Sequence, residues 1–98
     1  MGLLVEYTVK DDRSSDQVEA LHTFVAGLKA IGDGSFSYTA YETDDPTRFI
    51  AVFEFDDEAA KQRFLQSAAF AEYREGAKDR FVNPPKATPI RLVASTRD

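Results

Sequence analysis

Four stretches of the chain alternate apolar and polar residues with a period of two, which is typical of β-strands that cover a core with one face. They are residues 3–9, 36–43, 48–55 and 89–95. The third stretch is apolar on both sides over most of its length, and this pattern favours a central strand. Aspartates and a proline between the second and third stretches are turn residues, so these two strands are expected to form a hairpin.

A longer stretch, residues 14–31, places apolar residues at steps of three and four, the spacing of an amphipathic helix. Its predicted core stripe consists of Val18, Leu21, Val25 and Leu28, widened by Phe24 and Ile31. Ser14 or Ser15 is expected to cap the start of this helix, with Gln17 or Glu19 completing a capping box. The run Gly-Asp-Gly that follows is expected to end it, because glycine adopts the left-handed conformation that closes helices.

A second helix is expected as one continuous segment from about residue 57 to residue 78, with aspartates before it as caps. The connector that follows contains two prolines and is expected to be extended. The element order is therefore strand, helix, strand, strand, helix, strand. It predicts an α+β ferredoxin-like fold, a four-stranded antiparallel sheet with both helices on one face, formed by residues 1–98 as a single domain.

The alternation divides the sheet into two faces. The face toward the helices is expected to carry Val5, Tyr7, Val9, Phe36, Tyr38, Phe49, Ala51, Phe53, Ile90 and Leu92. The open face is expected to carry Leu4, Glu6, Thr8, Thr39, Tyr41, Ile50, Val52, Glu54, Arg91 and Val93. An exposed apolar patch of this kind marks an interface or a ligand groove, so we expect a homodimer through the sheet face.

Composition and charge exclude several classes of site. The chain has 98 residues and a formal net charge of −5, with no cysteine and one histidine. Disulfides, thiolate catalysis and cysteine-based metal centres are therefore excluded, and a histidine-built metal site is disfavoured. An acidic chain without clustered cations is not expected to bind nucleic acid. The apolar runs are too short to cross a membrane and there is no signal-peptide core, so the expected location is the cytoplasm.

Two segments resemble a known family, the antibiotic-biosynthesis-monooxygenase-like domains. The family pattern has an apolar strand ending in a glutamate and an aromatic residue, followed by a helix of the form His-Leu-x-Ser/Thr with two later aromatic or apolar positions. The residues that match this pattern are Glu54, Leu65, Ser67, Phe70 and Tyr73. Phe64 stands at the position of the family's histidine, and the tryptophan common after the glutamate has no counterpart.

The resemblance implies a dimeric α/β barrel built from two ferredoxin-like protomers. It also implies cofactor-independent oxygen chemistry, without metal or flavin, on a small aromatic or quinol-like molecule. The missing histidine favours the alternative, a non-catalytic or stress-associated dimer that holds a small apolar ligand. The Asn-Trp-His set of the haem-degrading subgroup is absent, so haem breakdown is not expected.

Six residues are candidates for the site. The candidate catalytic bases are Glu54 and His22, and the candidate substrate-binding residues are Tyr41, Arg91, Val52 and Ile50. Each has a structural alternative. Glu54 and Arg91 could form an ion pair at the dimer contact, because a buried charge needs a partner. Tyr41 suits an interface that is apolar at one end and wet at the other, and His22 flanks the core stripe of the first helix. We expect the pocket to lie between helices and sheet or at the dimer contact.

Overall fold

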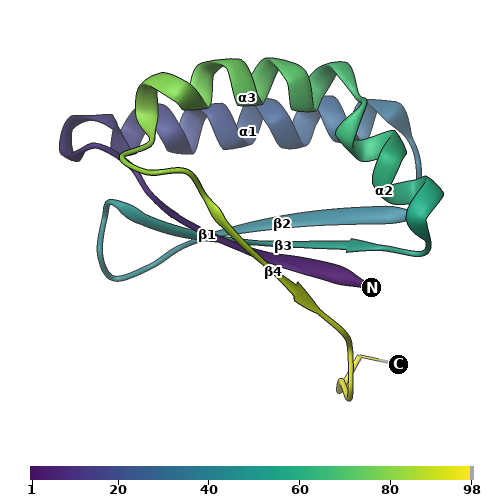
Figure 1. Ribbon diagram of the computed structural model, residues 1–98. Helices are drawn as coiled ribbons and strands as arrows, with labels where there is room; N and C mark the ends of the chain where they lie inside the picture. Colours follow the sequence, from purple (N-terminus) through teal and green to yellow (C-terminus); the bar gives the residue numbers. More distant parts are fainter. Residues whose placement is uncertain (98) are drawn as a thin grey trace.

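The computed structural model describes residues 1–97 and forms two layers, with the helices packed on one face of a four-stranded sheet (Figure 1). The strands are β1 (Gly2–Thr8), β2 (Phe36–Glu42), β3 (Arg48–Phe55) and β4 (Lys86–Ile90). They lie in the order β2-β3-β1-β4, and every neighbouring pair is antiparallel. The helices are a short 3-10 turn η1 (Asp11–Arg13), then α1 (Ser14–Ile31), α2 (Glu58–Leu65) and α3 (Ala68–Arg80).

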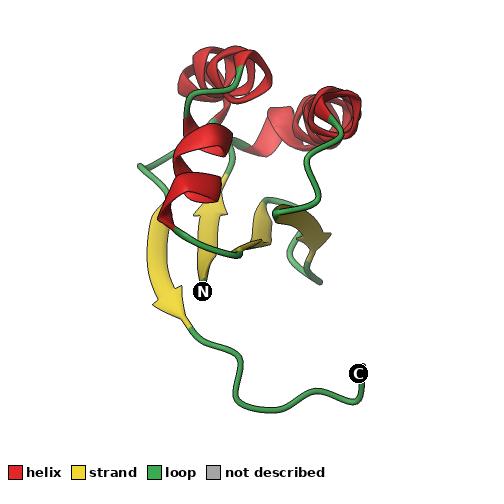
Figure 2. Ribbon diagram, turned by 90° about the vertical axis from the view of Figure 1, so that its right-hand side faces the viewer, coloured by secondary structure: helices red, strands yellow, loops and turns green. Residues whose placement is uncertain are grey.

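This architecture confirms the predicted ferredoxin-like α+β fold. Figure 2 shows the helical layer on one side of the strands, and no helix or strand of residues 1–97 covers the other side of the sheet. The predicted face toward the helices forms the core: Phe49, Ala51 and Phe53 of β3 are buried together with Tyr7 of β1. Within residues 1–97, no helix is both long and apolar enough to span a bilayer.

The prediction of one continuous second helix was wrong, because the chain breaks at Ser67 into α2 and α3. Ser67 has an extended backbone, with φ −69° and ψ 148°. Its hydroxyl donates to the carbonyl oxygen of Phe64 at 2.7 Å and accepts from the backbone N–H of Phe70 at 3.1 Å. A serine that satisfies freed backbone groups at both sides of a break stabilises the break. The change of direction lets α3 pack along α1 (Figure 1).

The predicted bounds of the last strand were also wrong, because β4 begins at Lys86 and ends at Ile90. Ile90 pairs with Gly2, which also pairs with Glu54 of β3, so these residues share the open face. The sequence pattern placed Ile90 on the helix side, and a shift of register by one residue reverses the face of every side chain. Pro89 is tolerated here because β4 is an edge strand.

The residues expected to continue the last strand lie outside it. Leu92 was assigned to the helix side, and Arg91 and Val93 to the open face, but all three follow the end of β4. They belong to an exposed segment, residues 91–97, in which the side chain of Val93 is 96 % exposed. The open face of the sheet itself retains the half-buried Leu4, Ile50 and Val52.

Candidate functional site

A large apolar pocket lies between the sheet and α3, with a volume of about 620 Å³. Side chains of β1 and β3 form one wall, α3 forms another, and the connector from α3 to β4 closes a third. Representative residues of these three walls are Val5, Phe53, Phe70, Tyr73, Phe81 and Pro84. A concave apolar space of this size is typical of a small-molecule site.

Packed aromatic rings keep the inner wall of this pocket rigid. The rings of Phe53 and Phe64 are stacked with centroids 4.0 Å apart, and those of Phe24 and Tyr73 are stacked at 4.4 Å. Phe64, at the position of the family's histidine, is buried and makes further ring contacts with Tyr38. An aromatic ring here completes a dry wall and brings no proton acceptor to the pocket.

A buried polar cluster lies behind Tyr73, at the end of the helical layer nearest the start of α1. Gln17 is completely buried. Its Nε2 donates to the hydroxyl oxygen of Tyr7 at 2.7 Å and to that of Tyr73 at 2.8 Å. Its Oε1 accepts from Nε of Arg80 at 2.7 Å. The cluster therefore joins β1, α1 and α3 through one amide group.

The cluster has a fixed direction of hydrogen bonding. Arginine offers donors only, so Arg80 requires the carbonyl end of Gln17, and both N–H groups of the amide then face the tyrosines. The oxygens of Tyr7 and Tyr73 accept, and they lie 3.5 Å from each other. Neither tyrosine gives its own hydrogen to Gln17. The Tyr73 hydroxyl donates to the Tyr7 hydroxyl oxygen at 3.5 Å, a long and therefore weak bond that a ligand oxygen can replace.

Tyr7 and Tyr38 stay protonated, because their pKa values are raised. Burial raises the pKa of Tyr7 well above its usual range, and the nearby Tyr73 raises it further. Burial and the neighbouring Tyr73 act in the same direction on the pKa of Tyr38. Tyr38 and Tyr73 both line the pocket, so they can act there as hydrogen-bond donors.

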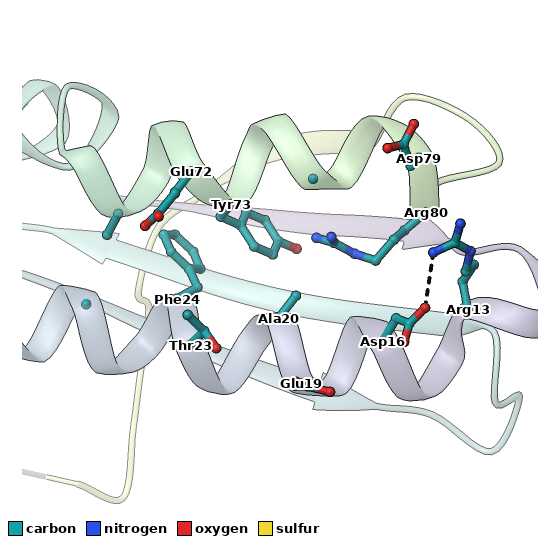
Figure 3. A pocket seen from close by; sticks show the side chains of 13 residues that line it. Arg13, Asp16, Glu19, Ala20, Thr23, Phe24, Glu72, Tyr73, Asp79 and Arg80 are labelled. Atoms are coloured by element: carbon teal, nitrogen blue, oxygen red, sulfur yellow. Dashed lines mark hydrogen bonds and ion pairs between the residues drawn. The ribbon is translucent and has the colours of Figure 1, made fainter.

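Arg80 is the charged member of the cluster, and only 9 % of it is exposed. Its guanidinium carbon lies 5.6 Å from the ring centroid of Tyr73. Figure 3 shows its side chain lying along a second cavity, a groove of about 510 Å³ between α1 and α3, and pointing toward Tyr73. Gly76 makes this position possible, because a Cβ there would lie 2.6 Å from Nη1 of Arg80. Nη2 of Arg80 is buried and has no hydrogen-bond partner among the described residues.

None of the six site residues proposed from the sequence lines this pocket. His22 is exposed on α1, in the helical layer. Glu54 is exposed on the open face, and Val52, two residues earlier in β3, lies on the same face. Ile50 pairs directly with Tyr41 of β2. Arg91 follows β4 and makes no ion pair with Glu54 among residues 1–97. Apart from His22, these residues therefore lie on or beside the open face, and their roles stay predictions.

The sequence interpretation missed Gln17 and Arg80, and it assigned Gln17 to a capping box that does not form. A signal was present: Gln17 lies on the buried stripe of α1 with Leu21, Phe24 and Leu28, and a polar residue on such a stripe needs buried partners. Ser14, expected as a cap, instead donates to the carbonyl oxygen of Pro46 at 2.8 Å. In the part of the chain that the structure describes, no group of three acidic or imidazole side chains is placed to hold a metal ion.

Solved structures share this fold over nearly the whole chain. A protein of unknown function from Nitrosomonas europaea has a TM-score of 0.83 at 20% identity, covering 99% of this chain and 92% of its own. Rv0793 from Mycobacterium tuberculosis has a TM-score of 0.82 at 16% identity, covering 97% and 96%. An antibiotic biosynthesis monooxygenase has a TM-score of 0.81 at 14% identity, covering 95% and 98%. At sequence identities of 14–20%, these similarities show a shared fold and nothing more specific.

Sequence comparison adds the family. No curated protein matches the chain in sequence. The sequence profile described as antibiotic biosynthesis monooxygenase matches residues 1–76, which include β1, α1, the β2–β3 hairpin and the part of α3 that carries Tyr73. Arg80 and the connector that closes the pocket follow the matched region. The chain belongs to the antibiotic biosynthesis monooxygenase family.

Proposed function

We propose that this protein is a cofactor-independent monooxygenase that oxidises a small phenol or quinol-like molecule in the pocket beneath α3. The observation that carries the proposal is Tyr73, which lines a largely apolar pocket and whose hydroxyl is held from behind by the amide of Gln17. A phenolic substrate needs an apolar wall for its ring and a donor for its oxygen, and this pocket supplies both. Membership of the family supports the same class of reaction.

The proposed reaction converts a phenol and O₂ into a quinone and water. The substrate loses its phenolic proton and passes one electron to dioxygen, and the resulting superoxide combines with the ring radical. The ring peroxide takes up one proton from solvent and becomes a hydroperoxide. The hydroperoxide then loses water together with the hydrogen of the ring carbon, which leaves one oxygen atom on the ring as a carbonyl. Tyr73 donates its hydroxyl hydrogen to the substrate oxygen while that oxygen carries negative charge. The apolar wall excludes water from the deprotonated substrate and from the ring radical.

No carboxylate or imidazole lines the pocket among the described residues. We therefore propose that the phenol gives its proton to solvent before it enters and binds as the phenolate, which suits the more acidic phenols and quinols. The same observation favours the second candidate function, a non-catalytic protein that binds a small apolar ligand in this pocket. The two differ in whether a bound quinol is consumed together with oxygen.

We further propose that the working form is a homodimer joined through the open face of the sheet. The half-buried Leu4, Ile50 and Val52 form the centre of this face, and Ile90 extends it at the edge. A second copy would cover these side chains with the same apolar surface. The exposed segment 91–97 follows Ile90 directly in the chain. In such a dimer Glu54, Tyr41 and Arg91 would lie at or near the contact.

Oxygen uptake with a panel of naphthols and naphthoquinols, in buffer treated with a chelator, tests the enzyme proposal. We expect uptake matched by quinone formation, and incorporation of one atom of labelled dioxygen into the product. Tyr73→Phe should lower the turnover at least tenfold, because it removes the donor to the substrate oxygen. Glu54→Gln should leave the turnover unchanged.

The reverse pattern, in which Glu54→Gln abolishes uptake and Tyr73→Phe does not, would move the site to the open face. Tight binding of the same compounds without oxygen uptake would favour the ligand-holding alternative. Each variant needs a matched melting temperature, so that a loss of activity is not a loss of fold.

A further inference from the structure

Charged residues of α3 line the cavities on both of its flanks, and the cation Arg80 lies on the same flank as two of its carboxylates. Glu72 and Asp79 line the groove toward α1, as Figure 3 shows, together with Asp16 and Glu19 of α1. Arg74 and Lys78 line the apolar pocket on the other flank. They are four residues apart, so they lie on the same face of the helix in successive turns.

These two cations are the only charged residues that line the pocket among the described residues. The chain as a whole has a formal net charge of −5, so its most apolar pocket carries charge of the opposite sign. A charged lining in a small-molecule site fixes the orientation and selects the charge of the ligand. Cations at the edge of an aromatic-walled pocket fit a molecule with an apolar ring system and an anionic group.

Both cations are free to exchange their present contacts for a ligand. The guanidinium carbon of Arg74 lies 5.5 Å from the ring centroid of Phe70, at the pocket wall, and no carboxylate lies within ion-pair distance of Arg74 among residues 1–97. Lys78 reaches Glu75 at 3.4 Å, and both side chains of this pair are largely exposed. An ion pair of that kind contributes little, so a ligand anion can replace it.

We propose that the pocket takes an aromatic organic anion, with its ring against the aromatic wall and its carboxylate between Arg74 and Lys78. This inference rests on the proposed function for the location of the site and adds the substrate class. A carboxylate held at the mouth orients the opposite end of the ring toward Tyr73. The anionic group thus sets which ring position reaches Tyr73.

Calorimetric titration of the full chain with naphthalene-2-carboxylate and with naphthalene-2-carboxamide tests the substrate class. The two probes have nearly the same shape and differ in charge at neutral pH. We expect the carboxylate to bind roughly three- to tenfold more tightly at low salt, with the preference shrinking as salt is added. The double variant Arg74→Gln, Lys78→Gln should remove the preference. Lys10→Gln, which removes one exposed charge away from the pocket, should keep it.

Equal affinity for the two probes in the wild-type protein overturns the anion proposal and leaves the pocket of the proposed function intact. A carboxylate preference that survives in the double variant also overturns it. Binding of neither probe overturns the anion proposal and the assignment of the pocket together. Glu75→Gln removes the present partner of Lys78 and should increase the preference for the carboxylate probe. This is the opposite of the effect expected for the double variant.

Discussion

Gln17 and Arg80 lie 63 positions apart in the chain and meet in a hydrogen bond of 2.7 Å inside the protein. This contact sets the direction of the Gln17 amide, so that its two N–H groups face Tyr7 and Tyr73. One buried amide thereby ties the sheet to both long helices and takes no hydrogen from either tyrosine, so the Tyr73 hydroxyl can exchange its long bond to Tyr7 for a ligand oxygen. Stability and the proposed chemistry depend on the same side chain.

Gln17→Leu should therefore destabilise the protein by about 2–4 kcal/mol, because it removes the partner of a buried guanidinium N–H, of the buried Tyr7 hydroxyl and of the half-buried Tyr73 hydroxyl. The free energy of unfolding from urea titration measures this change. Gln62→Leu, at an exposed position of α2, is the control and should change stability by less than about 0.5 kcal/mol. A loss no larger than that of the control would mean that the cluster does not stabilise the fold.

Ser67→Ala tests the break between α2 and α3. The variant loses the hydroxyl that caps α3 and bonds the carbonyl oxygen of Phe64, so we expect a loss of about 1 kcal/mol in the free energy of unfolding. Ser15→Ala, on an exposed part of α1, should have little effect. An unchanged or increased stability of Ser67→Ala would indicate that the break is set by packing alone.

The Asp33 carboxylate should make stability depend on acid pH. The Ser35 hydroxyl and the Arg63 guanidinium hydrogen-bond this carboxylate, and together with the Ser35 backbone N–H they lower its pKa to about 2. The folded-state pKa is below the unfolded value, so the contribution is complete above about pH 4 and disappears as the pH falls toward 2. Melting temperatures of wild type and Asp33→Asn should differ at pH 7 and converge near pH 2.

Asp44→Asn is the control for this pH series, because Asp44 is an exposed hairpin residue outside the Asp33–Ser35–Arg63 contact. Its melting temperature should follow that of the wild-type protein across the whole range. A constant difference between wild type and Asp33→Asn from pH 7 to pH 2 would contradict the assignment.

Val52→Lys tests the proposed dimer. The substitution would place an ammonium group at the centre of the contact between sheets, where burial of an unpaired charge is costly. We expect the wild-type protein to elute with twice the mass of one 10.9 kDa chain in size-exclusion chromatography with light scattering, and the variant to elute as a single chain. Ala26→Lys, exposed on α1, should stay dimeric. A wild-type mass of one chain would refute the dimer.

The sequence predicted the fold well where the pattern is local and repeated. Alternation along residues 36–43 and 48–55 predicted the hairpin and its core face correctly, because successive side chains of a strand point to opposite faces of the sheet. Residues 86–90 could not be read this way, since prolines interrupt the alternation and pairing with β1 sets the register. Ser67 lies within a stretch where apolar residues keep the helical spacing without interruption. The hydrophobic pattern therefore did not indicate the break between α2 and α3.

The candidate site was predicted less well, for a physical reason. The sequence interpretation looked for charged groups beside apolar strands and chose Glu54, whereas the apolar pocket lies on the other face of the sheet. Its polar end depends on Gln17 and Arg80, which meet only after the chain has folded. A single sequence gives the face on which each residue lies and does not give which distant residues meet.

A crystal structure with a bound naphthoquinone, the product class of the proposed reaction, tests the central assignment most directly. We predict ring density in the pocket beneath α3, with a quinone oxygen within hydrogen-bond distance of Tyr73 Oη. Density on the open face beside Glu54 and Tyr41, with the pocket beneath α3 empty in the same crystal, would contradict the account.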